Sequence, residues 1–579
     1  MKKFVAVLLV LMFVTFSGVG RVRSAVGEVF CQIPLSVFSR SPAGSFSVPV
    51  MVINKGTSDM RIQKIEIILQ DGTNVLEETL SEMLTPSSLQ GLTDEEIRSS
   101  IGIVQPDEKS LATAQALITQ AATMGQGEER TRTVETAWLL LMTTTANVED
   151  ATAEKVLSQA RILSVTIPLD KLNTKIEPSA VIPVRLDITI QGSDGSVSTI
   201  SQTTNLFYLT SLPSQWGWYP GDGHLHSKWS DGNSLVSSVA ATASNRGLKW
   251  TIITDHAGDT AHPTTPSGQS RLEASEWTTY GGTSPLGCTY AQTTSGITVC
   301  PGEELATNEG PPGSHLLSYK NSSYAASFPT SPPGNLKQGL INNANNAGGF
   351  GIIAHPYNSF FSWSDWHDDP YTGFRGIELI SNGTVVDATQ IADWDSYLRG
   401  HLSTTMQDPN HRFCVGLAGS DFHNTWVSDY LGANMNYIYT GSSTPPGSSR
   451  TSVYSALENG RVCASSDGSL LVHKITTGGT YLPGYYMQKS AAGNITVNVY
   501  AAYFMSMPVG GWAKVEIITS AGTIITDYVV SQTIVNKDYS IYVSGDTYVR
   551  VQVTFFDGNT RFSSCFTNPT FIDFTPYNQ

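Results

Sequence analysis

The sequence predicts an α/β protein in which a central domain of alternating strands and helices lies between two β-sandwich-like domains. Residues 30–80 and 165–210 alternate apolar and polar side chains with a period of two, as half-buried strands do. Residues 216–466 instead alternate short, continuously apolar strands with helix-like stretches, which is typical of a parallel sheet or a barrel. After Asp467 the period-two alternation returns.

The amino terminus has the layout of a secretory signal. A Met-Lys-Lys start, an apolar run from Phe4 to Phe16, and small or polar residues up to Ala25 predict a signal peptide over residues 1–25. A membrane anchor is the competing interpretation, but the apolar run has about 13 residues and a spanning helix needs about 20. We therefore expect a secreted or periplasmic protein with no stable membrane anchor.

The N-terminal domain is predicted over residues 26–212. Alternation of Ile65, Ile67 and Leu69, and again of residues 184–190, indicates strands bounded by turns. Between them, residues 88–163 look helical: Thr93 and Glu96 fit a capping box, and runs rich in Ala and Leu follow. This pattern predicts a β-sandwich-like domain with a helical insertion over about residues 88–163.

The two remaining domains are predicted over residues 216–466 and 467–579. The apolar strands of the central domain include Thr251–Thr254, Phe350–Ala354 and Gly376–Ile380. The C-terminal domain shows alternation at Ile495, Val497 and Val499, and again at residues 549–555, which predicts a second β-sandwich-like domain.

Charge and cysteine content limit the class of partner. The formal net charge of −15 argues against a nucleic-acid polymer, because such binders need a basic surface to release counterions. Small-molecule substrates fit better. The six cysteines form no CxxC pair, which excludes a thiolate zinc knuckle and a redox motif. Cys288 and Cys300 are candidates for a local disulfide, and buried free thiols are the alternative for the other four.

Metal-binding side chains recur at the ends of the central strands. Ten of the eleven histidines lie between His224 and His423. His224 and His226 are two apart in a predicted strand, so both imidazoles point to the same side. Polar residues at the carboxyl ends of apolar strands are where βα barrels place their active sites. The candidate ligands are His224, His226, Asp231, His256, Glu304, His315, His355, Asp421 and His423.

This ligand set is large enough for more than one ion. A catalytic zinc uses about three protein ligands and leaves one position for water, so the set fits two or three divalent ions with a bridging carboxylate. His, Asp and Glu accept Zn, Mn and Fe alike, so the residue types do not choose the metal.

The motifs resemble, in order, those of the polymerase and histidinol phosphatase (PHP) family. The resemblance covers about residues 220–466. It implies a TIM-like (β/α)7 barrel, meaning one with seven strands, and metal-dependent phosphoesterase activity. The motifs that carry it are HLH at 224–226, SDG at 230–232, TDH at 254–256, GEE at 302–304, AHP at 354–356 and GSDFH at 419–423.

The resemblance also implies a trinuclear arrangement. One ion would be held by His224, His226, Glu304 and Asp421; a second by Glu304, His315 and His355; and a third by Asp231, His256 and His423. Glu303 is adjacent to Glu304. The family spacing after Gly302 favours Glu304, which leaves Glu303 to point away or to contact a ligand from outside.

Clustered divalent ions predict the reaction type. They lower the pKa of a shared water to near neutrality, so hydroxide on the metals can attack phosphorus or a carbonyl carbon without a serine or cysteine nucleophile. Asp255 is a candidate for orienting a ligand imidazole or, as the alternative, for moving protons. Lys228, Arg271 and Asn424 are candidates for contacting an anionic substrate, and each is alternatively a surface residue.

Three functions compete. The leading hypothesis is hydrolysis of phosphate mono- or diesters. The exported layout with flanking β domains resembles a branch of the family that includes carbaryl and amide hydrolases, so the same site acting on a carbamate, an amide or a carboxylic ester is the alternative. A non-catalytic protein that contacts glycan or a cell surface through its β domains is the third. The complete ligand set disfavours it, because converging polar donors are costly to bury.

Other histidines and aromatic residues have no such setting. His262, His367, His401, His411 and His473 are interpreted as solvated or core residues. Trp363, Trp366 and Tyr357 fit either an aromatic pocket wall or ordinary core packing.

Overall fold

The computed structural model shows a mixed α/β protein with two compact units. The division between the two units falls between Ser211 and Leu212. The structure describes residues 29–574 apart from 41–44, 101–107, 143–155, 157–158, 173–178, 228–229, 231, 233, 235, 258–295, 308–313, 323–324, 326–335, 359–362, 364, 369–370, 382–387, 409–411, 424–430, 433, 447–449, 506, 508–509 and 558–559.

The first unit encloses an apolar core between two sheets. The alternation predicted from the sequence is confirmed, because Ile65, Ile67 and Leu186 point inward with at most 1% exposure. They pack against Val48 and Val50 of the other sheet. One sheet has the order β1-β3-β6, and the other β2-β8-β7-β4-β5. The strands are β1 Val29–Gln32, β2 Ser36–Ser39, β3 Ser45–Asn54, β4 Met60–Leu69, β5 Asn74–Leu84, β6 Arg161–Pro168, β7 Ala180–Gly192 and β8 Val197–Tyr208.

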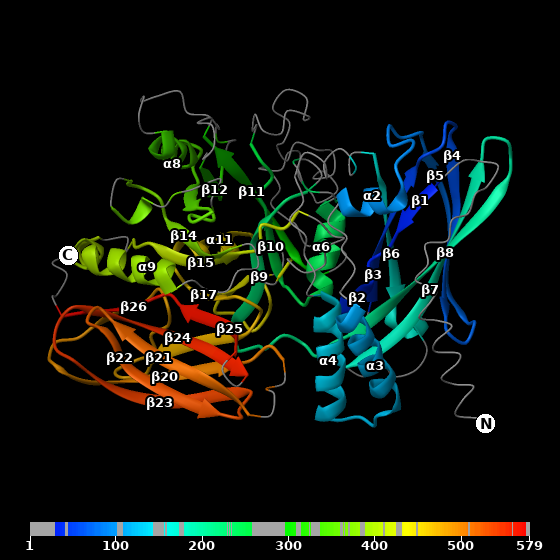
Figure 1. Ribbon diagram of the computed structural model, residues 1–579. Coiled ribbons are helices and arrows are strands. Elements are labelled where there is room, and N and C mark those ends of the chain that lie inside the picture. The colour runs from blue at the N-terminus through cyan, green and yellow to red at the C-terminus, as the bar shows by residue number, and fades with distance from the viewer. Residues whose placement is uncertain are drawn as a thin grey trace. The chain divides into compact units, whose positions relative to one another are not determined.

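Among the described residues, three helices follow β5, where the sequence predicts helical structure. They are α2 Asp94–Ser100, α3 Glu108–Thr123 and α4 Glu128–Met142, and Figure 1 shows α3 and α4 side by side. Thr93 and Glu96 form the predicted capping box: Glu96 Oε2 accepts the Thr93 N–H at 2.7 Å, and Thr93 Oγ1 accepts the Glu96 N–H at 3.1 Å. The helical prediction extends too far, because β6 already begins at Arg161 and pairs with β3.

Seven strands of the second unit form a continuous series in which the order in the sheet equals the order in the chain. The strand order is β9-β10-β11-β12-β13-β14-β15. Their bounds are β9 Trp218–Leu225, β10 Trp250–Ile253, β11 Thr298–Ala306, β12 His315–Tyr319, β13 Phe350–Ile353, β14 Gly376–Ser381 and β15 Val415–Gly419.

One strand of this series departs from the predicted parallel pattern. β12 runs antiparallel to both β11 and β13, whereas the other neighbours pair in parallel. Only residues 307–314 separate β11 from β12. A parallel connection needs a crossover of about a dozen residues or more, so this short segment permits only a reversal. The reversal pairs Ala306 with His315 and brings the start of β12 to the end of β11.

The first and last strands of the series meet. Residues that follow β15 pair with the end of β9: Phe422 bridges Leu225 in parallel, and the Phe422 carbonyl accepts the His226 N–H at 2.8 Å. Earlier in β15, asparagine side chains make the backbone hydrogen bonds that a neighbouring strand would otherwise make. Asn568 bonds both the N–H and the carbonyl of Gly416, and Asn436 does the same for Ala418.

Helices lie between several of these strands. α6 connects β9 to β10, α8 precedes β13, and α9 and α10 lie between β14 and β15. The apolar residues Leu340 and Ile341 of α8 and Ile391 and Leu398 of α9 enter the core that contains β13–β15. The bounds are α6 Val236–Asn245, α8 Leu336–Asn346, α9 Ala388–Gly400, α10 Leu402–Gln407 and α11 Arg450–Glu458, with short 3-10 helices η1 Leu169–Leu172 in the first unit and η3 Trp366–Asp368 here.

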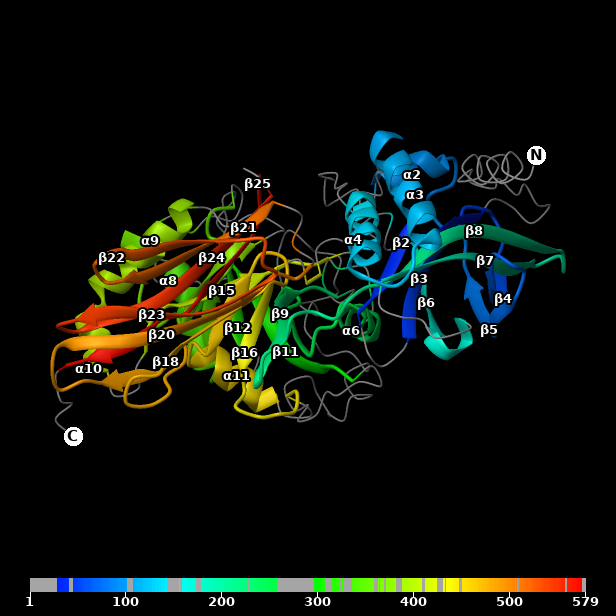
Figure 2. The same cartoon turned by 90° about the horizontal axis from the view of Figure 1, so that it is seen from below.

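The C-terminal strands continue the same sheet. β9 pairs with β16, β16 with β17, and β17 with β25, which leads on to β24, β21 and β22. A three-stranded sheet β18-β20-β23 packs against them over a core that includes Val497, Val499, Val551 and Val553 (Figure 2). The bounds are β16 Met435–Tyr439, β17 Val462–Ser465, β18 Leu470–Ile475, β19 Tyr486–Gln488, β20 Gly493–Ala502, β21 Gly511–Thr519, β22 Gly522–Val530, β23 Ile534–Val543, β24 Thr547–Asp557, β25 Thr560–Thr567 and β26 Thr570–Asp573.

A buried ion pair fastens α9 to β24. Nε of Arg550 lies 2.7 Å from Oδ1 of Asp395, and a second guanidinium nitrogen lies 2.5 Å from Oδ2. The Arg550 guanidinium also lies over the Trp394 ring, 5.2 Å from its centroid. The Trp394-Asp395 pair therefore holds the C-terminal strands against the strand series that carries the candidate ligands.

Two sequence predictions meet the limits of the described residues. The predicted signal peptide and Cys288 lie outside them, so neither the leader nor a Cys288–Cys300 bond is described. Cys31, Cys414, Cys463 and Cys565 are buried free thiols. Among the described helices, none is long and apolar enough to cross a lipid bilayer.

Candidate metal centre

The candidate ligands gather where strands β9, β10, β13 and β15 end. His224 and His226 lie on either side of Leu225, the last residue of β9. His256 follows β10 and forms a parallel bridge with Glu304 of β11. His355, Asp421 and His423 follow β13 and β15 in the same way. His315 reaches the same end of the sheet because β12 is reversed.

Glu304 is the centre of this group. Its side chain is 1% exposed, and five imidazoles surround it. Oε2 lies 3.1 Å from His226 Nε2, and Oε1 lies 2.7 Å from His315 Nδ1. The remaining distances to Glu304 oxygens are 3.4 Å from His224 Nε2, 3.3 Å from His256 Nδ1 and 3.2 Å from His355 Nε2.

Two overlapping groups around Glu304 have their ligand atoms within 4.8 Å of one another. The first group is His224, His226, Glu304 and Asp421. The second is His256, Glu304 and His315. His355 approaches the same Glu304 oxygen as His315, so the combination of Glu304, His315 and His355 drawn from the PHP resemblance is also brought together.

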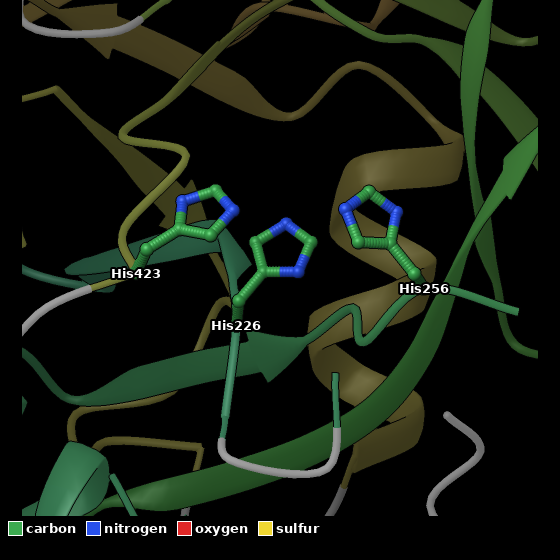
Figure 3. A group of neighbouring side chains, drawn as sticks. All are labelled: His226, His256 and His423. Carbon is green, nitrogen blue, oxygen red and sulfur yellow. The ribbon is translucent and has the colours of Figure 1, made fainter. Parts of the chain in front are cut away.

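A third group consists of His226, His256 and His423. Figure 3 shows their three imidazoles side by side, carried by segments that follow three different strands. The rings of His226 and His423 are stacked with centroids 4.2 Å apart, and those of His226 and His256 are 4.7 Å apart. The PHP resemblance puts Asp231 with His256 and His423, but Asp231 lies outside the described residues.

The residues present fit a multinuclear metal centre. Nε2 of His224 and Oε2 of Glu304 are fully buried and make no hydrogen bond, although they face each other. A buried polar atom without a hydrogen bond is costly, and a divalent cation between such atoms satisfies them. Imidazole nitrogen and carboxylate oxygen are ligands that Zn and Mn both accept.

Electrostatic coupling within the cluster is strong. Burial lowers the pKa of His224, but the carboxylates of Glu378, Asp421 and Glu304 outweigh it and raise the pKa well above its usual value. Burial raises the pKa of Glu304, but His315 and the other imidazoles outweigh it and hold the pKa well below its usual range. The cluster therefore favours negative carboxylates beside positive charge, which a bound cation supplies equally well.

Two of the ligands lie in the left-handed region of backbone conformation. His355 has φ of 26° and Asp421 has φ of 53°. For residues other than glycine this region costs on the order of 1–3 kcal/mol, and such residues cluster at functional sites. Each lies within two residues of its strand's end, where a change of direction turns the side chain towards the cluster.

Sequence reasoning missed Glu378, which contacts two of the candidate ligands. It lies in β14, and its carboxylate meets the His224 ring and the His355 backbone. The available signal was an acidic residue inside the apolar strand Gly-Ile-Glu-Leu-Ile. A carboxylate in a fully buried strand needs a partner.

Sequence reasoning also missed Asp222. Its fully buried carboxylate accepts the N–H groups of His224, Ser420 and Gly432 at 3.2–3.3 Å. Burial raises its pKa to about 6, although these hydrogen bonds oppose the shift. Asp222 thereby ties the end of β9 to the segment after β15. The sequence feature that could have indicated Asp222 is its position two residues before His224 in the same strand.

Asp255, a candidate for orienting a ligand imidazole, is connected to the His226 ring through Ser230. Asp255 Oδ1 accepts the Ser227 N–H at 2.6 Å and the Ser230 hydroxyl at 2.9 Å, and Ser230 Oγ lies 3.2 Å from His226 Nδ1.

Glu303 points away from the cluster, as one alternative predicted. Its Oε2 accepts the Asn321 side-chain amide at 2.7 Å and the Ala325 N–H at 2.8 Å. Because successive residues of a strand face opposite sides, Glu304 alone of the pair reaches the ligands.

Several remaining candidates cannot be placed. Asp231, Lys228, Arg271 and Asn424 lie outside the described residues, as do His262 and His411.

The other histidines and the aromatic residues lie in structural settings. His473 is buried between the hydroxyls of Thr567 and Thr570, and His401 Nδ1 lies 3.0 Å from the Tyr397 carbonyl oxygen. Trp363 and Trp366 are 0% exposed and belong to the core. Trp363 donates its indole N–H to the His315 carbonyl at 2.7 Å, so it supports a candidate ligand from behind.

No protein-family model and no curated protein sequence matches this chain. Among solved structures, it is similar to a two-domain protein of Bacteroides vulgatus containing a predicted PHP-like metal-dependent phosphoesterase, with 14% identity, a TM-score of 0.33, and coverage of 61% of this chain and 98% of that one.

Two β-glucuronidases are also similar over most of the chain, which spans less than two thirds of their length. The enzyme of Parabacteroides merdae shows 8% identity and a TM-score of 0.17, with 94% of this chain and 64% of that one covered. The enzyme of Bacteroides uniformis shows 9% identity and a TM-score of 0.16, with 94% and 61% covered.

Proposed function

We propose that this chain is a metal-dependent hydrolase of the PHP type that cleaves phosphate esters, exported by the signal peptide predicted over residues 1–25. The observation that carries the proposal is the buried Glu304 carboxylate with five imidazole nitrogens 2.7–3.4 Å from its oxygens. Divalent ions bound there supply Lewis acidity, which lowers the pKa of water towards neutrality and stabilises charge on the oxygens of an ester.

Hydrogen bonds within the protein determine which imidazole nitrogen carries the lone pair that can bind a cation. Ser230 donates its hydroxyl hydrogen to Asp255, so its oxygen is left to accept from Nδ1–H of His226. That bond puts the lone pair of the His226 imidazole on Nε2, the atom that faces Glu304 and Asp421. The Asp255–Ser230–His226 chain therefore fixes a tautomer suited to binding a cation.

The cluster also limits the access of bulk water. His224, His226, Glu304 and His355 are at most 2% exposed, whereas the His423 side chain is 34% exposed. The exposed side of the cluster thus lies at His423. We infer that a substrate approaches there, because an ester must reach ligand-bound ions without displacing the buried donors.

The test combines metal content with turnover. Purified protein is analysed for bound metal and for hydrolysis of bis-p-nitrophenyl phosphate, with His224→Ala and the control His401→Ala beside the wild type. His401 contacts the Tyr397 carbonyl rather than the cluster. We expect two or three ions per chain, and loss of metal and activity in His224→Ala only. Metal without phosphodiester turnover would redirect the proposal to carbamates, amides or carboxylic esters, and a wild type without metal would refute it.

A further inference from the structure

Glu378 touches two candidate ligands through different groups. Its Oε1 lies 3.0 Å from Nδ1 of His224, and its Oε2 accepts the backbone N–H of His355 at 2.9 Å. We propose that Glu378 is a positioning residue of the metal centre, which sets the tautomer of His224 and fixes the backbone that carries His355. This role rests on the proposed function, because it requires the cluster to bind divalent ions.

The contact with His224 determines which nitrogen faces the cluster. An ionised carboxylate only accepts hydrogen bonds, so Nδ1 of His224 must carry the hydrogen. In the neutral ring that binds a cation, the lone pair then lies on Nε2, which is 3.2 Å from Oδ1 of Asp421 and 3.4 Å from Oε2 of Glu304. A carboxylate behind a ligand imidazole fixes its ring and makes its free nitrogen more basic.

The contact with His355 acts on the backbone. His355 has φ of 26°, a conformation that persists only where surrounding contacts hold it. Oε2 of Glu378 accepts the N–H of this same residue. The bond therefore stabilises the turn that brings the His355 ring to within 3.2 Å of Glu304.

Gly419 lies beside the Glu378 carboxylate, where any side chain would collide with it. Gly419 is the last residue of β15, and a Cβ atom there would come within 1.8 Å of Oε1 of Glu378 and 2.9 Å of Cβ of His224. No side chain larger than hydrogen fits without moving one of them. The absence of a side chain at residue 419 thus serves the Glu378–His224 contact.

Glutamine at position 378 tests the role with almost no change of shape. Its amide has one oxygen, so it accepts from His224 or from His355 but not from both, and its NH2 group then opposes an N–H donor. Glu303→Gln is the matched control, because Glu303 is equally buried and accepts two hydrogen bonds but faces away from the ligands.

The measurement is the Zn²⁺ affinity of the metal-free full chain, determined in competition with a chelating indicator, together with the melting temperature of the metal-free forms. We expect Glu378→Gln to bind at least one Zn²⁺ about 10–100-fold more weakly than the wild type, as loss of such a contact does elsewhere. Glu303→Gln should retain the wild-type affinity.

The outcomes separate the two proposals. A wild type that binds no Zn²⁺ would refute the proposed function and this role with it. Wild-type affinity in Glu378→Gln would refute the role of Glu378 alone, as would equal losses of affinity and of melting temperature in both variants. Should Glu378→Gln not fold, Gly419→Ala provides the second test, since it keeps the carboxylate but displaces it. Unchanged Zn²⁺ affinity in a folded Gly419→Ala would overturn the positioning role.

Discussion

Glu303 and Glu304 are neighbours in β11 but face opposite sides of it. Oε2 of Glu303 bonds the Asn321 amide and the Ala325 N–H, whereas Oε1 of Glu304 lies 2.7 Å from His315 Nδ1. The alternation of side chains along a strand thus gives two adjacent carboxylates, equally buried, separate roles. One bonds Asn321 and Ala325, and the other joins the candidate ligands.

Glu304→Gln should abolish metal binding at more than one position. Glu304 belongs to two of the three ligand groups, so removing its charge weakens both. We expect the loss of affinity and turnover to exceed the roughly 10–100-fold cost of losing an outer contact. Elemental analysis and phosphodiester hydrolysis measure it. Glu303→Gln should bind metal as the wild type does. A similar loss of metal in both variants would show that any change in β11 is sufficient to weaken metal binding.

Much of the core and of the ligand set could be predicted from sequence. Residues such as Ile65 and Val497 follow the period of a strand, and that local pattern is decided by burial on one face. The ligands His224, His355 and Asp421 lie where apolar strands end, which is where the active sites of βα barrels are found.

The remainder depends on contacts that no local pattern contains. Glu378 meets His224 across 154 residues of sequence. The pairing of β17 with β25 joins Cys463 to Thr567, which is also distant in the chain. The reversal of β12 could have been predicted, because residues 307–314 are too few for a crossover. The hydrogen bonds from the Asn436 and Asn568 side chains to the β15 backbone could not, since an asparagine gives no sign in the sequence of what it bonds.

Removing the Asp395 carboxylate should strongly destabilise the protein. Asp395 is the partner of the Arg550 guanidinium, whose side chain is 0% exposed. Asp395→Ala leaves that charge buried and unpaired, which costs about 3–5 kcal/mol. The free energy of unfolding from urea titrations measures it. Lys537→Ala, which breaks an ion pair with a 52% exposed lysine, is the control and should change stability little. Equal effects would contradict the assignment of Asp395–Arg550 as a structural link.

His473 should make stability depend on pH. Burial lowers its pKa from 6.5 to about 3, so the folded protein keeps it neutral while the unfolded chain binds a proton below pH 6.5. The unfolded state then holds more protons, and the stability contributed by neutral His473 is lost as pH falls from 6.5 towards 3.

The difference between wild type and His473→Gln isolates this group, because all other titrations are shared. Between pH 6.5 and pH 4 the wild type should lose about 3 kcal/mol more than the variant. Urea unfolding at both pH values gives the comparison. Parallel pH profiles for the two proteins would show that His473 does not titrate on unfolding.

Asn436 should support the metal centre through the backbone of β15. Its Oδ1 accepts the Ala418 N–H at 2.8 Å, and its Nδ2 donates to the Ala418 carbonyl at 2.5 Å. Asn436→Ala leaves both buried groups without a partner, at about 1–3 kcal/mol each. Because β15 leads directly into Asp421, we expect a loss of Zn²⁺ affinity as well as of stability.

A matched change on β20 separates the two effects. Asn498 bonds the side chains of Asn536 and Asp538 rather than any backbone, so Asn498→Ala should leave both the free energy of unfolding and Zn²⁺ affinity close to wild type. If Asn436→Ala loses stability but binds Zn²⁺ normally, the hydrogen bonds from Asn436 to Ala418 stabilise β15 without affecting the metal centre. Loss of both would show that the direction in which Asp421 leaves β15 depends on side chains that stand in for a neighbouring strand.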